Sequence, residues 1–165
     1  GKEVSLEELG KQLGMSKNTV ERYLDLLSKV FVVFKIGGYS RNLRKEIVKN
    51  SRWYFYDNGV RNSIIQNFNR LDLRADVGGL WENYLAVERM KFQNYSQMHC
   101  NNYFWRTYDQ QEIDWVEEEG DKLRAFEFKY QNSKGSKVPG AWAKAYPHAS
   151  YETIHTGNYL DWIGG

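Results

Sequence analysis

The sequence predicts a mixed α/β (α+β) chain in which two short helices and a β-hairpin precede an α-β-β-β-α-β unit. Amphipathic helix patterns begin at Ser5 and Ser16, and alternating strand patterns fill residues 102–130. With 165 residues, 41% of them hydrophobic, the chain can form one ordinary domain or two small ones. We expect three segments: a helix-hairpin unit over 1–60, a helical linker over 61–78 and the α-β-β-β-α-β domain over 79–165.

The N-terminal segment has the pattern of a winged helix-turn-helix. Ser5 with Glu8 has the spacing of a capping box, and Gly14 ends the first helix. The second helix begins at Ser16 and has an apolar stripe at helical spacing: Val20, Tyr23, Leu24, Leu27 and Val30. The strand-like segment 30–36, a basic loop and a second strand-like segment at 52–57 then predict a hairpin. In a winged helix, the start of the second helix meets the DNA major groove.

The charge distribution supports contact with DNA by this segment. Residues 1–60 hold 11 Lys and Arg against 7 Asp and Glu, a net charge of +4, whereas residues 61–165 hold 12 against 14, a net charge of −2. Basic side chains add affinity by contacting phosphates. The alternative is a helix-turn-helix used for packing or protein contact. The four acidic residues of the two helices favour this alternative. The residues predicted to contact DNA are Ser16, Lys17, Asn18, Thr19, Arg22, Arg41, Arg44 and Lys45.

The C-terminal segment is expected to form a small sheet between helices. A helix follows the Gly78-Gly79 break, which is a hinge or a helix start. Short polar turns separate three strands, which predicts an antiparallel meander. A short helix ended by Pro147 and a last strand complete the pattern. The three predicted meander strands span residues 102–107, 112–119 and 122–130.

Two acids of the meander are predicted to lie close together. Asp114 and Glu127 are about equally far from the turn at Gly120-Asp121, so they can lie opposite each other. Lys129 projects from the same strand face as Glu127. Paired carboxylates repel each other unless a positive charge lies between them, and Mg²⁺ or Mn²⁺ would supply it. The pattern therefore predicts a metal-assisted phosphodiester site in which Lys129 stabilises the developing oxyanion or orients the attacking water.

Asp114, twelve intervening residues and the triplet Glu127-Phe128-Lys129 resemble the core motif of the PD-(D/E)XK nucleases. The resemblance implies that Asp114, Glu127 and the helical acid Glu82 hold the metal and act in catalysis together with Lys129. The chain departs from the family pattern at Ile113, where the family has proline.

Six segments of the chain carry a second resemblance: GGYSRNLRKEIVKNSRWYFYDNGVRN, GGLWENYLAVE, YFWRT, EIDWV, AFEFKY and VPGAWAKAYP. With them the chain resembles, nearly end to end, the C-terminal region of unknown function attached to prokaryotic AAA-type ATPases. This resemblance implies a winged helix and a PD-(D/E)XK-like domain after an N-terminal P-loop ATPase module. The chain has no G-x-x-x-x-G-K-[ST] motif. We therefore expect this chain to be a fragment of a longer protein. Its expected partners are DNA and the ATPase module, and only that module would bind ATP. An oligomer is also possible on this reading of the sequence.

Simpler structural roles remain for each predicted site residue. Glu82 fits an acid that stabilises a helix N-terminus, Asp114 belongs to an acidic hairpin, and Glu127 with Lys129 fits a surface ion pair. Two functions therefore stay open: a divalent-metal DNA endonuclease-like enzyme, or an inactive nucleic-acid- or protein-binding module that positions the ATPase. Four groups within reach of one cation favour the enzyme, and a Glu127–Lys129 pair favours the module.

Composition limits the location of the protein. Cys100 is the only cysteine, which excludes an internal disulfide and fits a reducing compartment. The chain has no signal-peptide pattern and no apolar run of membrane-spanning length. These features predict a cytoplasmic protein that does not use a membrane.

Overall fold

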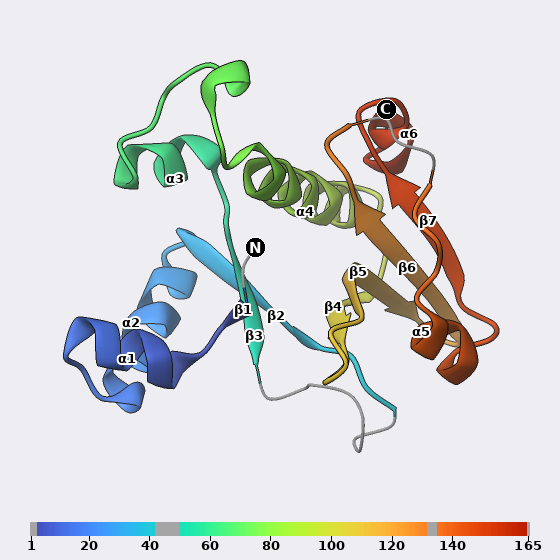
Figure 1. The fold of residues 1–165 in the computed structure, drawn as a ribbon, viewed down its shortest axis with the longest axis horizontal. Coiled ribbons are helices and arrows are strands. Elements are labelled where there is room, and N and C mark those ends of the chain that lie inside the picture. Colours follow the sequence, from blue (N-terminus) through green and yellow to red (C-terminus); the bar gives the residue numbers. More distant parts are fainter. Residues whose placement is uncertain (1–2, 42–49, 132–134, 165) are drawn as a thin grey trace.

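A computed structural model describes residues 3–41, 50–131 and 135–164 (Figure 1). It confirms the mixed α/β class, with one seven-stranded mixed sheet in the order β1-β3-β2-β4-β5-β6-β7. No helix in these ranges is both long and apolar enough to cross a bilayer. In chain order the elements are β1 (Glu3–Val4), α1 (Leu6–Leu13), α2 (Lys17–Lys29), β2 (Val33–Gly38), β3 (Ser51–Phe55), α3 (Asn58–Ile64), the 3-10 helix η1 (Leu71–Leu73), α4 (Val77–Tyr95), β4 (Asn101–Arg106), β5 (Glu112–Glu119), β6 (Lys122–Phe128), α5 (Gly140–Ala145), β7 (Ser150–Ile154) and α6 (Tyr159–Trp162).

The predicted helix caps are confirmed. The Ser5 hydroxyl accepts a hydrogen bond from the Glu8 N–H at 3.3 Å, and the Ser16 hydroxyl accepts one from the Thr19 N–H at 3.1 Å. Gly14 ends α1 with a φ of 64°, a left-handed conformation that glycine adopts readily. Helix α4 begins at Val77, so the Gly78-Gly79 pair lies in its first turn and is a helix start.

The hairpin and the meander form one continuous sheet, which the sequence did not predict. Strand β2 pairs antiparallel with β3 and also pairs parallel with β4, through Gly37 with Tyr103 and Gly38 with Phe104. The Tyr39 N–H extends this contact by donating to the Phe104 carbonyl at 2.7 Å. The sheet therefore crosses the boundary that the sequence suggests near residue 60.

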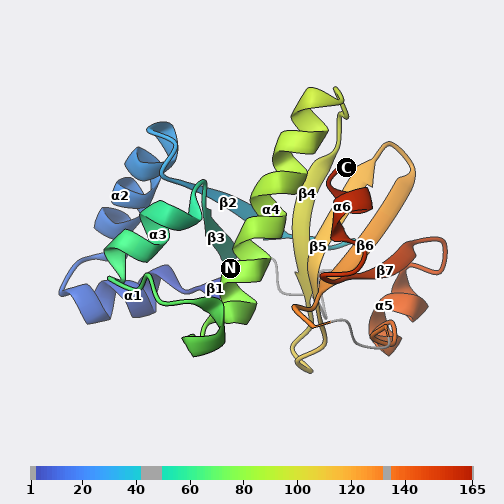
Figure 2. The same ribbon diagram turned by 90° about the horizontal axis from the view of Figure 1, so that it is seen from above.

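Helices cover both faces of the C-terminal half of the sheet. Helices α4 and α6 pack on one face, with a core that includes Leu85, Phe126 and Trp162. The other face packs on α5 through Trp105 and Trp142. Figure 2 shows α4 running along one side of these strands, with α1, α2 and α3 grouped at the opposite end of the molecule from α5.

A β-bulge interrupts β5 beside the predicted site. Tyr103 lies opposite Val116, but Trp105 lies opposite Ile113, so two residues of β5 face one residue of β4. The extra residue breaks the strict alternation of side chains, and Ile113 and Val116 both enter the core beneath α5. Asp114 lies inside this bulge, so its direction cannot be obtained by counting along the strand.

A buried ion network joins α4 to the sheet. Glu117 is completely buried and accepts hydrogen bonds from Arg89 at 2.5 and 2.8 Å and from Gln93 at 2.8 Å. Arg124 also donates to it at 3.2 Å, and Arg89 donates to the Trp162 carbonyl as well. Each buried charge thus has a counter-charge and several hydrogen bonds, the condition under which burial of an ion pair is tolerated.

Replacement of Glu117 by Gln is expected to destabilise the fold by about 3–5 kcal/mol, because Arg89 keeps its buried charge without a counter-charge. Glu119→Gln, on the same strand, is the matched control. The Glu119 side chain, which pairs with Arg124, is 37% exposed. Loss of this ion pair should therefore cost less than about 1 kcal/mol. Urea unfolding monitored by tryptophan fluorescence measures both values. Equal costs for the two variants would contradict the assigned role of Glu117.

Candidate functional site: an acidic cluster closed by arginine

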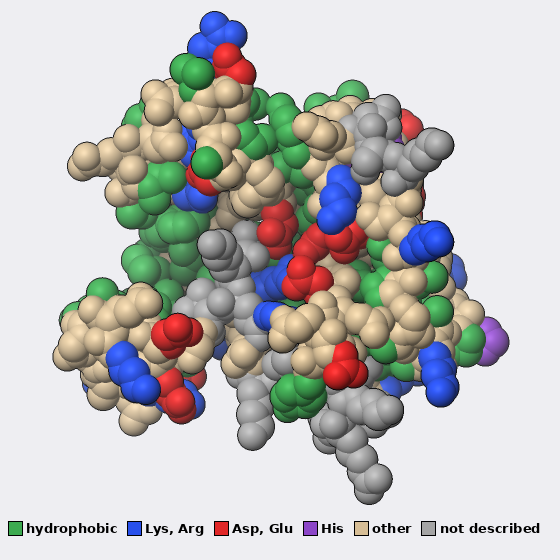
Figure 3. All heavy atoms as spheres, viewed as in Figure 1, with side chains coloured by type: hydrophobic (Ala, Val, Ile, Leu, Met, Phe, Trp, Pro, Cys, Tyr) green, Lys and Arg blue, Asp and Glu red, His purple; other side chains and the backbone are tan. Residues whose placement is uncertain are grey.

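The predicted acids meet a cation that belongs to the protein itself. Arg52 on β3 donates to Asp114 at 3.0 Å, to Glu82 at 3.3 Å and to Glu112 at 3.1 Å. Glu82 comes from the second turn of α4, and the other two acids come from β5. We call these four residues the Arg52 cluster. Figure 3 shows acidic and basic side chains gathered in a central hollow of the molecule.

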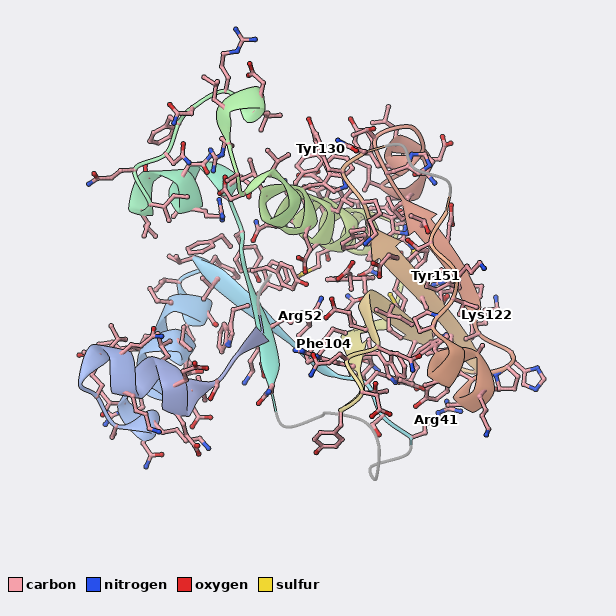
Figure 4. All side chains as sticks on the ribbon, viewed as in Figure 1. Arg41, Arg52, Phe104, Lys122, Tyr130 and Tyr151 are labelled. Carbon is pink, nitrogen blue, oxygen red and sulfur yellow. The ribbon has the colours of Figure 1, made fainter. Side chains whose placement is uncertain are left out.

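Arg52 is fixed between the two halves of the sheet. Its side chain is only 5% exposed, and its guanidinium lies 5.0 Å from the centre of the Phe104 ring (Figure 4). Burial lowers the pKa of Arg52, but Tyr54, Asp114 and Glu82 raise it by more, so the net pKa lies above the ordinary value. The guanidinium therefore stays charged and neutralises the acids around it.

Glu82 is held in a partly dehydrated position. Its side chain is 17% exposed, and the Tyr54 hydroxyl donates to its carboxylate at 2.9 Å. Burial raises the pKa of Glu82, and the negative charge of Asp114 adds to this effect. The positive charge of Arg52 lowers the pKa of Glu82, and the negative charge of Glu82 raises the pKa of Arg52. Each of these two groups therefore favours the charged form of the other.

Glu127 and Lys129 form a pair of their own. The Lys129 ammonium lies 2.7 Å from the Glu127 carboxylate, whose side chain is 14% exposed. Burial and the nearby Asp114 raise the pKa of Glu127 to about 7, although Lys129 lowers it. The hydrogen bond from Lys129 in turn raises the pKa of the lysine.

Asp114 and Glu127 thus lie close enough to influence each other, but they bind different groups. The Asp114 carboxylate accepts from Arg52 and from the Phe128 N–H, the latter at 2.9 Å. The pairs of β5 with β6 run as far as Trp115 with Phe126, a register that makes Asp114 and Glu127 the next neighbours. The predicted proximity is therefore present, whereas each carboxylate already has its own cation.

Carboxylates of this kind suit Mg²⁺ or Mn²⁺ by their donor chemistry, but their arrangement does not fit a bound ion. Within the described ranges, no three His, Cys, Asp or Glu side chains form a group that could hold a metal. Arg52 occupies the position between Glu82 and Asp114 that a cation would need. A metal could enter only if this guanidinium moved away.

The residues predicted to contact DNA do not form one surface. Five of them lie at the start of α2, where Ser16 caps the helix and Lys17 lies 3.5 Å from Glu7. Arg41 points elsewhere: it pairs with Glu118 of β5 at 3.4 Å, and its N–H donates to the Tyr146 hydroxyl at 3.1 Å. Arg44 and Lys45 lie outside the described residues.

The start of α2 faces a hollow of mixed charge between the helices and the β2–β3 hairpin. Acidic and basic side chains balance along it, so it offers no excess of positive charge to phosphates. Its charged lining consists of Glu7, Lys17, Glu21, Arg22, Asp25 and Lys35.

Sequence reasoning missed Arg52, Tyr54 and Glu112 as parts of the site. Arg52 and Tyr54 alternate with Trp53 in a short strand, a pattern that indicates a shared face but no partner. In the sequence, Arg52 is one of several basic residues of the N-terminal segment. Its role depends on the parallel pairing of β2 with β4, for which the local sequence carries no signal.

The raised pKa of Glu127 predicts a pH dependence of stability. Its pKa rises from an ordinary 4.5 to about 7 on folding, so the protonated form favours the folded state. This contribution is complete below about pH 4.5 and is lost as the pH rises through 7. Between pH 4.5 and 8, wild type should lose about 2 kcal/mol relative to Glu127→Gln.

Urea unfolding of both proteins across this pH range measures the difference. Glu152→Gln, an exposed position on the neighbouring strand β7, is the control and should follow wild type. A constant difference between wild type and Glu127→Gln would show that Glu127 titrates normally in the folded protein.

Comparison with known proteins places these features in a family. A family model described as Domain of unknown function (DUF8612) matches residues 1–71, and one described as Domain of unknown function (DUF4143) matches residues 77–160. Uncharacterized protein Rv2008c of Mycobacterium tuberculosis and Uncharacterized protein Mb2031c of Mycobacterium bovis are each 26% identical to this chain over 124 residues. The match covers 74% of this chain and 27% of each relative, so the chain spans about a quarter of their length.

No solved structure matches the chain. The second family model covers just over half of it and includes Glu82, Glu112, Asp114, Glu127 and Lys129. The chain therefore belongs to the DUF4143 family.

Proposed function

We propose that this chain is a non-cutting assembly module that keeps a PD-(D/E)XK-like fold and positions an AAA-type ATPase on a protein partner. The observation that carries the proposal is the Arg52 cluster, in which a buried guanidinium takes the place of a metal ion. The Glu127–Lys129 ion pair adds to it, because the lysine expected to act on substrate is bound to a carboxylate of its own chain.

Electrostatics explain why this arrangement suits a structural role. Three carboxylates surround one buried arginine, and hydrogen bonds from Tyr54 and from the Phe128 N–H satisfy two of them further. Such a network is stable as it is and gains little from an added cation. A metal-dependent nuclease needs open carboxylates that the ion can reach.

The ATPase part of the proposal rests on the family resemblance and on chain length. The matched segment is about a quarter of each mycobacterial relative, which leaves room for a large additional module. The C-terminal region that this chain resembles is attached to AAA-type ATPases in prokaryotes. We assign ATP binding to that module and none to this chain.

A protein partner is favoured over DNA by the surface of the N-terminal part. The hollow beside the first turn of α2 has balanced charge, and Phe68 and Leu73, which lie between α3 and α4, are 70% and 71% exposed. A DNA-binding surface is rich in unpaired Lys and Arg, whereas exposed apolar clusters are typical of protein contacts.

A second candidate function is a divalent-metal phosphodiesterase that is active only when Arg52 is displaced. The observation favouring it is the closeness of Asp114 and Glu127, which follow the Trp115–Phe126 pair in the register of β5 with β6. Burial raises the pKa of nearby Tyr151 to about 12, and both carboxylates add to this effect. This candidate requires that removal of the Arg52 side chain creates metal binding.

Calorimetric titration of Mn²⁺ and Mg²⁺, followed by a plasmid-nicking assay, tests the two functions. The proposed module should bind neither ion tightly and should leave supercoiled plasmid intact, and Asp114→Asn should behave like wild type. Metal binding that is lost in Asp114→Asn, together with metal-dependent nicking, would overturn the proposal. Nicking by Arg52→Ala alone would support the second candidate.

Arg52→Ala is also expected to destabilise the fold by about 3–5 kcal/mol, because the three carboxylates then lose the buried guanidinium that binds all of them. Lys35→Ala is the matched control, since Lys35 lies on the adjacent strand β2 and only approaches the Trp53 ring, at 5.9 Å. Its loss should cost less than about 1 kcal/mol. Chemical unfolding at neutral pH compares the two, and a small cost for Arg52→Ala would remove the cluster from the basis of the proposal.

A further inference from the structure

Exposed apolar side chains are concentrated in the N-terminal part of the described chain. The described residues include 18 large hydrophobic residues that are exposed, and 13 of these lie in the range from Leu13 to Leu73. Most soluble domains scatter such residues singly over the surface, and clusters of this kind mark interaction sites. Five of them follow one another along α2 and its C-terminal end. We call this set the α2 patch: Tyr23, Leu26, Leu27, Val30 and Phe31.

The apolar side of α2 faces away from the protein. Val20 is buried against the rest of the chain, but further along the helix Tyr23 is 55% exposed and Val30 is 65% exposed. The opposite, polar side of the helix, with Asn18 and Arg22, lines the hollow beside the β2–β3 hairpin. Figures 1 and 2 both place α2 at the outer edge of the molecule. The predicted stripe therefore exists, but most of it is uncovered, whereas an amphipathic helix normally buries this side.

The end of the α2 patch has an unusual backbone conformation. Phe31 has a φ of 57°, in the left-handed region where glycine or asparagine is normally found. Two hydrogen bonds hold it there, from its own N–H to the Ser28 carbonyl at 3.1 Å and from the Val32 N–H to the Leu27 carbonyl at 2.9 Å. The ring lies 5.8 Å from that of Tyr56 and is still 73% exposed. These two hydrogen bonds form a Schellman motif that ends α2, and the motif leaves the Phe31 ring at the surface beside the apolar side of the helix.

The α2 patch has no charged residue. On the polar side of α2, Asp25 and Lys29 pair with each other at 2.8 Å. A partner therefore needs no complementary charge, and two copies of the patch can meet without placing like charges together. This self-complementarity is what a two-fold symmetric contact requires.

We propose that, independently of the acidic site, two copies of this chain associate through antiparallel packing of their α2 helices. The two-fold axis passes beside Leu27, so that Leu27 faces Leu27 of the second copy. The spacing then places Tyr23 next to the second copy's Phe31. At about 200 Å² for a whole aromatic side chain, Tyr23 and Phe31 together expose about 250 Å². With Leu26, Leu27 and Val30, the patch can form the centre of an interface of about 800 Å² per copy.

Sedimentation equilibrium of the 165-residue chain in metal-free buffer without DNA tests this contact. Wild type should form a dimer as its concentration rises through the micromolar range. Leu27→Asp and Leu27→Lys should each weaken the dimer by at least about thirtyfold, because each places like charges on the two-fold axis. Leu160→Asp, at a 55% exposed position on α6, is the matched control and should dimerise like wild type. Circular dichroism confirms that each variant is folded.

An equimolar mixture of Leu27→Asp and Leu27→Lys should restore the dimer, because only a two-fold contact brings position 27 of one copy against position 27 of the other. A wild-type chain that stays monomeric throughout would overturn the proposal. So would a dimer that Leu27→Asp leaves intact, or variants that are folded but fail to pair when mixed. The outcome does not depend on whether the Arg52 cluster binds metal.

Discussion

The short parallel pairing of β2 with β4 determines where Arg52 meets the acids of the site. It joins the hairpin to the meander through Gly37 and Gly38, and β3 follows because it pairs with β2. Only this arrangement brings Arg52 between Glu82 on α4 and Asp114 on β5. The cluster is thus a consequence of sheet order: a strand from the N-terminal part delivers the positive charge, and elements of the C-terminal part deliver the negative charges.

Local features of the fold were predictable because the sequence encodes them locally. Ser5 and Ser16 cap helices as their spacing indicates, and the turn at Gly120 leads from β5 into β6. The closeness of Asp114 and Glu127 also follows from counting residues out from that turn. These inferences need only short-range geometry, in which a few residues decide the outcome.

The composition of the site was less predictable, for two physical reasons. The bulge at Asp114 and Trp115 changes the side-chain alternation of β5, and nothing in the sequence marks its position. The partner of the acids comes from a strand that is distant in the chain, so the expected positive charge was assigned to a metal. The charge argument itself was sound, because buried carboxylates do need a cation, but it does not determine which cation supplies the charge.

The same limit applies to α2. The sequence predicts the apolar stripe of this helix, but not which surface packs against it. A periodic pattern shows that one side of a helix avoids water, and it does not identify the surface that excludes the water. In the acidic site, by contrast, both partners of the contact are within this chain. Arg52 lies in the segment matched by DUF8612, and its three acids lie in the segment matched by DUF4143. A DUF4143 segment without the preceding hairpin would have to place Glu82 and Asp114 in a partly buried position without the counter-charge of Arg52. The two segments are therefore expected to be stable as one folded unit, with the buried guanidinium as the group that makes them interdependent.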